Sequence, residues 1–179
     1  MERYEPDILL RGDCVNMNKI GRDLFYNKLC ASVLIPNRLR GIFYKWGGVK
    51  LGKNVSICAR CFVGNDRLEI GNNTFINYNV WFNTAGGIKV GQNCDIAYGV
   101  TFVTSTHEIG DDRRRAGVSV SHGIEVGDGS WIGAGAMIMP GVKIGKGVMI
   151  GAGSVVTENC EDHCLYGGNP AKMIRKLVI

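Results

Sequence analysis

The sequence predicts an all-β protein built as a parallel β-helix, and three observations predict it. Apolar residues recur at every sixth position over most of the chain. Glycine, at 26 of 179 residues, is about twice as frequent as in an average protein, which indicates many tight corners. Proline, at four residues, is too scarce for a collagen-like or low-complexity chain. A six-residue period of this kind is typical of short strands and corners that stack as successive coils.

The six-residue step predicts which side chains face inward. Successive side chains of extended backbone alternate between two faces, so an apolar residue every six positions fits a short strand, a corner and another short strand. Three strands make one coil, and we expect about five coils. The predicted inward residues form five triplets: Leu51, Ile57, Val63; Ile70, Ile76, Phe82; Val90, Ile96, Phe102; Val126, Ile132, Ile138; and Ile144, Ile150, Val156.

The residue before each inward position should point outward, and the three faces differ in character. On the first strands, charges of opposite sign alternate from coil to coil, which predicts a face in solvent: Lys50, Glu69, Lys89, Glu125 and Lys143. The second strands present Ser56, Phe75, Asp95, Trp131 and Met149, and the third strands present Phe62, Trp81, Thr101, Met137 and Val155. Apolar stripes on two different faces favour a closed ring of subunits, so we predict a homotrimer.

Both ends of the chain depart from the six-residue step. Residues 1–48 predict a helical cap over the first coil, with one or two short amphipathic helices broken before Pro36. The expected buried stripe of this cap is Leu24, Phe25, Leu29, Val33 and Leu34. Residues 49–159 form the predicted β-helix, from which residues 107–123 protrude as a loop. Residues 160–179 predict an extension that carries Lys172, Arg175 and Lys176 on a short basic helix.

Composition and charge narrow the function classes. The net charge of +5 is spread along the chain without a basic run interleaved with aromatics, which argues against nucleic-acid binding. The chain has no apolar run of membrane-helix length and no signal-peptide pattern at its start, so we expect a cytoplasmic protein without membrane association. Its seven cysteines form an odd set that suits a reducing compartment. Cys58 and Cys61 could begin a zinc site, but no second pair lies at ligand spacing, and we expect free thiols and no metal.

Residues 48–176 resemble a known family. The stretch that begins at Ile124, "IEVGDGSWIGAGAMIMPGVKIGKGVMIGAGSVVTENCEDHCLYGGNPAKMIRKL", is similar to the C-terminal signature of the hexapeptide-repeat acyltransferases, and within them the sugar O-acetyltransferases of the galactoside and maltose acetyltransferase branch. The resemblance implies a left-handed β-helix, whereas the general rule for parallel crossovers would favour a right-handed one. It also implies a homotrimer with active sites between neighbouring subunits, and acetyl-CoA as cosubstrate.

One histidine stands where the repeat stops. His107 lies in "VTFVTSTHEIGDDRRRAGV", residues 100–118, between a regular strand and the predicted loop. The resemblance implies that it acts as a general base. An alcohol that attacks a thioester must lose its proton, and a neutral imidazole can accept that proton near pH 7. His122 and His163 match no such position, and we expect both to be structural.

The resemblance also implies roles for further residues. Asn77 matches an asparagine beside the acceptor hydroxyl, where an amide can donate to the oxyanion. We expect acceptor contacts from Asn77, Asn79 and Thr84. Thr84 or Ala85 stands where galactoside enzymes carry an acid, a departure that argues against galactoside itself as the acceptor. For coenzyme A the matching residues are Trp131, Ala134, Ala152, Thr157, Lys172 and Arg175, the last two being cations that suit phosphates.

These residues predict an acetyl-CoA-dependent O-acetyltransferase that modifies a hydroxyl of a sugar or glycan precursor, for example in polysaccharide biosynthesis. An N-acetyltransferase of an amino sugar or a serine-type acceptor is an alternative, and a non-catalytic structural β-helix trimer is another. Two interpretations remain for the arginine cluster in the loop, which consists of Arg113, Arg114 and Arg115. A charge cluster on a loop is usually solvated, and the alternative is a contact with a phosphate or nucleotide on the acceptor.

Overall fold

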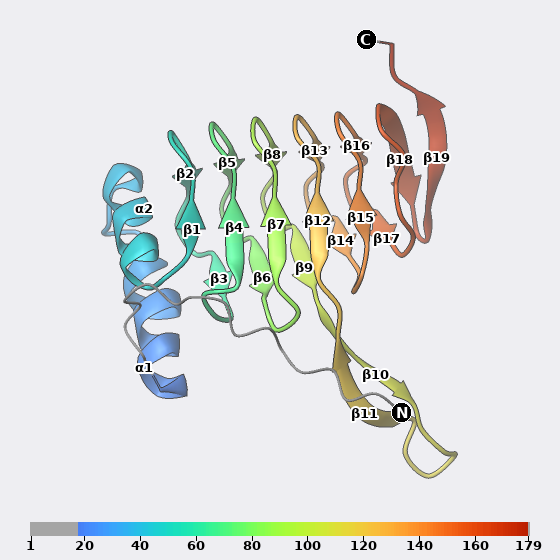
Figure 1. Ribbon diagram of the computed structural model, residues 1–179, viewed down its shortest axis with the longest axis horizontal. Helices are drawn as coiled ribbons and strands as arrows, with labels where there is room; N and C mark the ends of the chain where they lie inside the picture. Colours follow the sequence, from blue (N-terminus) through green and yellow to red (C-terminus); the bar gives the residue numbers. More distant parts are fainter. Residues whose placement is uncertain (1–17, 179) are drawn as a thin grey trace.

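The structure, a computed structural model, describes residues 18–178 and shows a left-handed parallel β-helix of about six turns (Figure 1). Three sheets form the sides of a prism, and we call them faces A, B and C in the order in which the chain visits them. Face A contains β1 (Lys50–Leu51), β4 (Leu68–Ile70), β7 (Ile88–Val90), β12 (Ile124–Val126) and β15 (Lys143–Ile144). Face B contains β2 (Ser56–Ile57), β5 (Phe75–Ile76), β8 (Asp95–Ile96), β13 (Trp131–Ile132) and β16 (Met149–Ile150), and face C contains β3 (Phe62–Val63), β6 (Trp81–Asn83), β9 (Thr101–Val103), β14 (Met137–Ile138) and β17 (Val155–Val156).

The predicted inward residues stack on one another through the prism. Leu51 pairs with Ile70, and Ile138 pairs with Val156, in parallel register. All of the predicted inward residues are buried except Leu51, which is half-buried at the first turn. Their apolar side chains form one continuous core, because each coil places the same position beside its equivalent about 4.8 Å away. The six-residue prediction is therefore confirmed.

The number of turns exceeds the predicted five because the chain after β17 adds part of another coil. Cys160 forms a parallel bridge with Ile144 on face A, and Tyr166 pairs with Ile150 on face B. Both side chains are buried at the end of the core. They continue the inward stack after the six-residue step has ended in the sequence.

The corner between faces B and C requires left-handed backbone, and glycine supplies it in the later coils. The corner residues, with their φ angles, are Arg60 (62°), Asn79 (59°), Gly99 (69°), Gly135 (67°) and Gly153 (69°). The corners stack directly, since the Gly99 amide donates to the Tyr78 carbonyl over 3.0 Å. This conformation costs a residue with a Cβ roughly 1–2 kcal/mol, and glycine and asparagine tolerate it best. Arg60 is the exception at this corner.

The described part of the cap contains α1 (Lys19–Leu24), which continues into the π-helix η1 (Phe25–Cys30), and α2 (Asn37–Trp46), which begins after Pro36 as predicted. The predicted buried stripe is wrong. Leu24, Leu29, Val33 and Leu34 are between 45% and 88% exposed, and Phe25 is half-buried. Tyr26 and Cys30 are buried instead. The wider turn of a π-helix, with hydrogen bonds from i to i+5, rotates the buried face away from the 3.6-residue pattern.

A buried arginine joins the cap to the first coil. The Arg40 side chain is 1% exposed. Its Nε donates to the Cys30 carbonyl over 2.8 Å, and its Nη1 donates to the Ile57 carbonyl over 2.9 Å. Its Nη2 donates to the Ser32 and Ile35 carbonyls over 2.8 and 2.6 Å. The guanidinium therefore binds four carbonyl groups of the π-helix, the following turn and β2, of which only the Ser32 carbonyl has a further backbone donor, the Ile35 amide.

A two-stranded hairpin leaves the prism after β9. β10 (Ser105–Ile109) and β11 (Ala116–Ser121) pair in antiparallel fashion and extend away from the coils (Figure 1). The chain returns to the prism where the His122 amide donates to the Thr104 carbonyl over 2.8 Å. The segment that the sequence predicts as a loop thus contains two regular strands.

The predicted C-terminal helix is wrong. β18 (Cys164–Gly168) extends face B, and β19 (Ala171–Lys176) folds back on it as an antiparallel strand. Lys172 and Arg175 are exposed on β19. The last strand of an open sheet presents unpaired backbone groups, and pairing them with β19 overrides the helix propensity of a short basic segment.

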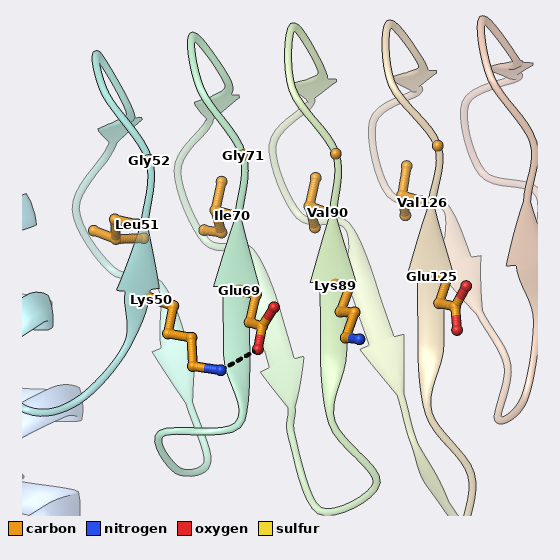
Figure 2. A pocket seen from close by; sticks show the side chains of 12 residues that line it. Lys50, Leu51, Gly52, Glu69, Ile70, Gly71, Lys89, Val90, Glu125 and Val126 are labelled. Atoms are coloured by element: carbon orange, nitrogen blue, oxygen red, sulfur yellow. Dashed lines mark hydrogen bonds and ion pairs between the residues drawn. The ribbon is translucent and has the colours of Figure 1, made fainter. Parts of the chain in front are cut away.

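Face A carries the predicted charge ladder. Lys50 Nζ lies 2.5 Å from a Glu69 carboxylate oxygen (Figure 2). Lys143 Nζ lies 3.6 Å from a Glu125 carboxylate oxygen. These side chains are largely exposed, so the face is polar and solvated as predicted. Among residues 18–178, no helix combines the length and apolarity that crossing a membrane requires.

Candidate active site

His107 lies on β10, opposite Ser119 of β11, and its side chain is exposed. Its imidazole makes no hydrogen bond to the part of the chain that the structure describes. The root of the hairpin is firmly held, because Asn83 Oδ1 accepts from Thr104 Oγ1 over 2.7 Å and from Ser105 Oγ over 3.1 Å. Both imidazole nitrogens are thus open to a ligand, on a hairpin whose base is fixed to the prism.

Asn77 lies at the corner between faces B and C, directly after β5. Its side-chain oxygen accepts from the Tyr78 backbone amide over 2.8 Å. This contact orients the side chain and leaves its NH₂ group as a donor. Asn79, two residues on, is the exposed left-handed corner residue of the same turn.

The structure does not bring His107 and Asn77 together within one chain. His107 belongs to the hairpin that leaves the prism between faces C and A, after β9 and before β12. Asn77 stands at the corner between faces B and C, where its amide pairs with the Ile96 carbonyl of the next coil. Face C separates the two corners.

The structure buries Thr84, from which the sequence predicts an acceptor contact. Its side chain is 1% exposed. The Thr84 hydroxyl accepts from the Asn65 amide over 2.7 Å and lies 3.3 Å from the Asn65 carbonyl. Thr84 follows β6, and its side chain points into the prism. Its hydroxyl joins two neighbouring coils by hydrogen bonding to Asn65 and is therefore not available to an acceptor.

The residues expected to bind coenzyme A fall into two groups. Ala134 and Ala152 stack at the corner between faces B and C, where the Gly153 amide donates to the Ala134 carbonyl over 2.8 Å. Trp131 is 52% exposed on the neighbouring face B. Thr157 follows β17 at the other edge of face C, next to Glu158, which pairs with Lys172 over 3.3 Å. Arg175 is exposed opposite Leu165.

A pocket that sequence reasoning missed lies between the cap and the first two coils. It has a volume of about 490 Å³, and its lining includes Asn27, Lys28, Arg60, Phe62 and Trp81. An alignment of the corner positions in the sequence, beside that of the inward positions, would have singled out Arg60. It stands where the following coils have Asn79, Gly99 and Gly135.

Two family models match this chain, both for hexapeptide repeats. "Hexapeptide repeat of succinyl-transferase" matches residues 67–102, and "Bacterial transferase hexapeptide (six repeats)" matches residues 116–158. The gap between them, residues 103–115, contains β10 with His107 and the turn of the hairpin, whereas β11 lies within the second match. These two segments of the chain are therefore similar to hexapeptide repeats of transferases.

Similar hexapeptide-repeat proteins include acetyltransferases. The maltose O-acetyltransferase of Clostridium difficile 630 is 29% identical, with a TM-score of 0.71 over 86% of this chain and 83% of that one. A galactoside acetyltransferase solved in complex with coenzyme A is 27% identical, with a TM-score of 0.77 over 87% of this chain and 78% of that one. The predicted resemblance to this branch is confirmed.

A curated relative is "Putative acetyltransferase SACOL2570" of Staphylococcus aureus (strain COL), which is 38% identical over 110 residues, 62% of this chain and 55% of that protein. This chain therefore spans a little more than half the length of the curated relatives it matches.

The cysteines of the hexapeptide repeat are buried thiols. Cys61 Sγ lies 3.2 Å from the Asn77 carbonyl oxygen, and burial raises the pKa of the Cys61 thiol to about 11. Burial also raises the pKa of Cys58. Within residues 18–178, no three His, Cys, Asp or Glu side chains gather as a metal site would require.

Proposed function

We propose that this protein is an acetyl-CoA-dependent O-acetyltransferase that modifies a hydroxyl of a sugar or glycan precursor. The observation that carries the proposal is His107, which stands exposed on the one hairpin that leaves the described prism. The likeness to a galactoside acetyltransferase solved with coenzyme A, at 27% identity, supports the same reaction class. In this proposal the hairpin supplies one wall of the acceptor cleft.

His107 serves as the general base in this proposal. Its imidazole takes the proton of the acceptor hydroxyl while the oxygen attacks the thioester carbonyl carbon. The Asn77 amide donates to the resulting tetrahedral oxyanion. When the carbon–sulfur bond breaks, the coenzyme A sulfur leaves as a thiolate and takes up the proton from the imidazolium. The products are the acetyl ester and free coenzyme A, and the enzyme returns to its starting state.

The proposal requires a second copy of the chain, because one chain keeps His107 and Asn77 at different corners. We propose a homotrimer in which faces B and C pack against neighbouring subunits, so that the hairpin of one chain reaches the corner between faces B and C of the next. Trp131 and Met137 on these faces are 52% and 38% exposed. Exposed apolar side chains on two faces suit a closed ring.

Coenzyme A would lie along the corner that Ala134 and Ala152 form. Small side chains there let the pantetheine arm approach the backbone, and Trp131 flanks it. Thr157, Lys172 and Arg175 would come from the other edge of face C, with the two cations meeting phosphates. Because acetyl-CoA is the donor, we place the reaction in the cytoplasm, in the synthesis of polysaccharide precursors.

The test is an acceptor screen that follows release of the coenzyme A thiol from acetyl-CoA, with sugars, amino sugars and serine as acceptors. We expect turnover on a sugar hydroxyl and an ester product by mass spectrometry. His107→Ala should lower kcat by about 10²–10⁴ while coenzyme A binding persists. His122→Ala, at the exposed root of the hairpin, is the matched control and should keep wild-type turnover. An amide product, or full activity of His107→Ala, would contradict the proposal.

A further inference from the structure

The pocket between the cap and the first two coils combines positive charge with an aromatic wall. Lys28 of η1 and Arg60 of the first corner both line it, and both side chains are exposed. Neither forms an ion pair with a carboxylate in residues 18–178, and the described lining contains no acid. Two unpaired cations in a concave site attract an anion, because low-dielectric walls concentrate their field.

Arg60 stands at a backbone position that disfavours it. With φ at 62°, it occupies the left-handed corner that glycine fills in later turns and Asn79 fills in the next one. Its amide is fixed by donating to the Ala31 carbonyl over 2.8 Å, so the cap holds this conformation in place. A residue kept in a strained conformation where glycine or asparagine would serve points to a use for its side chain.

The wall beside these cations is a stacked aromatic pair. The rings of Phe62 and Trp81 lie 3.8 Å apart at an interplanar angle of 7°, and Trp81 is 47% exposed. Such a flat apolar surface suits the apolar face of a sugar ring. Asn27 adds a polar group, since its side-chain oxygen accepts from the Val63 amide over 2.9 Å. Its Nδ2 is closed off from solvent and has no partner in the described chain.

The pocket is adjacent to the proposed acceptor site. Asn77, Tyr78 and Asn79 form the corner one turn above Arg60, and the Asn79 amide lies 3.4 Å from the Ala59 carbonyl. Neighbouring coils are about 4.8 Å apart, which is close to the width of a pyranose ring. A sugar whose hydroxyl lies at Asn77 can therefore place a substituent from the far side of its ring near Arg60 and Lys28.

We propose that this pocket binds the anionic group of the acceptor, so that the substrate is a sugar carrying a phosphate or a carboxylate. Arg60 and Lys28 bind the anion, and the Phe62–Trp81 pair supports the ring. The inference rests on the proposed function, which places the acceptor hydroxyl at Asn77. The binding of an anionic sugar can be measured whether or not the protein transfers an acetyl group.

The test is calorimetric titration of the whole protein with three probes: glucose 6-phosphate, glucuronate and glucose. Wild-type protein should bind one or both anionic sugars at least about tenfold more tightly than glucose, and the two anionic arms tell phosphate from carboxylate. Arg60→Asn and Lys28→Gln should each remove most of that preference. Lys53→Gln, which removes a cation at a different corner of the same coil, should keep it.

The conformation of the Arg60 corner makes it possible to tell a loss of binding from a loss of folding. Arg60→Asn installs the residue type of the next corner, so its melting temperature should equal or exceed that of the wild type. If these sugars bind but no acetyl group is transferred, the proposed function fails and the pocket assignment stands. Equal binding of all three probes, binding of none, or a preference that survives in both cation variants would overturn the assignment.

Discussion

His107 and Asn77 lie at opposite edges of face C, although the resemblance that singles them out places both in one site. The exposed imidazole and the outward NH₂ group of Asn77 both lack the partner that the chemistry requires within their own chain. A closed ring of prisms brings the two edges together, because the edge of one prism then meets the next. Assembly and catalysis are thus linked in this account.

A charged side chain placed on face C should therefore dissociate the trimer into single chains. Met137→Lys puts a cation on an apolar stripe, and burying it in a subunit interface without a partner is costly. We expect light scattering coupled to gel filtration to give the mass of three chains for the wild type and of one chain for the variant. Lys89→Met on face A is the control and should remain a trimer. A wild type of one-chain mass would contradict the predicted assembly.

Arg40 should be the most sensitive position of the cap. Arg40→Met leaves the carbonyls of Cys30, Ile57 and Ile35 without their donor, while the Ser32 carbonyl keeps only the Ile35 amide. Buried acceptors without a partner are costly, so we expect a loss of about 3 kcal/mol or more in the free energy of unfolding, measured with urea. Arg38→Met, exposed on the same helix, should change it by less than about 0.5 kcal/mol. Similar losses in both variants would refute the role of Arg40.

The six-residue step predicts the core well because it follows from geometry alone. A residue such as Ile132 must face inward if its neighbours alternate, and its partner Ile150 follows from the coil length. The cap gives no such constraint. An α-helical period predicts Leu24 and Leu29 inside, whereas the π-helix turns Tyr26 and Cys30 inward. No local sequence feature predicts that the helix changes from an α-helical to a π-helical pitch at this point.

The site divides in the same way. The break in the repeat marks His107, and local motifs mark Asn77, Ala134 and Ala152, because each stands at a recognisable place in the coil. Burial of Thr84 and the separation of His107 from Asn77 depend on which corner each residue occupies in space. The sequence predicts a helix for the C-terminal segment. It cannot indicate β19, because the open sheet edge with which β19 pairs exists only in the folded prism.

Buried thiols should make stability fall at alkaline pH. Burial raises the pKa of Cys61 to about 11 and that of Cys30 to about 12, above the ordinary value near 9. Above pH 9 the unfolded chain therefore releases these protons before the folded chain does. Each such thiol lowers the free energy of unfolding by up to about 1.4 kcal/mol per pH unit between the two pKa values.

Urea unfolding between pH 8 and pH 11 measures this slope. Cys61→Ala removes one titrating group, so its stability should fall less steeply than that of the wild type across pH 9–11, whatever its stability at pH 8. Identical slopes for the two proteins would show that Cys61 does not titrate differently in the folded and unfolded states.

The most direct measurement mixes two inactive variants. His107→Ala and Asn77→Ala should each retain about 1% of wild-type acetyl transfer or less. If each site takes His107 from one chain and Asn77 from its neighbour, random trimers of an equal mixture carry both residues at one site in four. The account predicts about a quarter of wild-type activity when the variants are refolded together and mixed trimers are verified by two affinity tags. Mixed trimers with no more activity than their parents would contradict a site shared between chains.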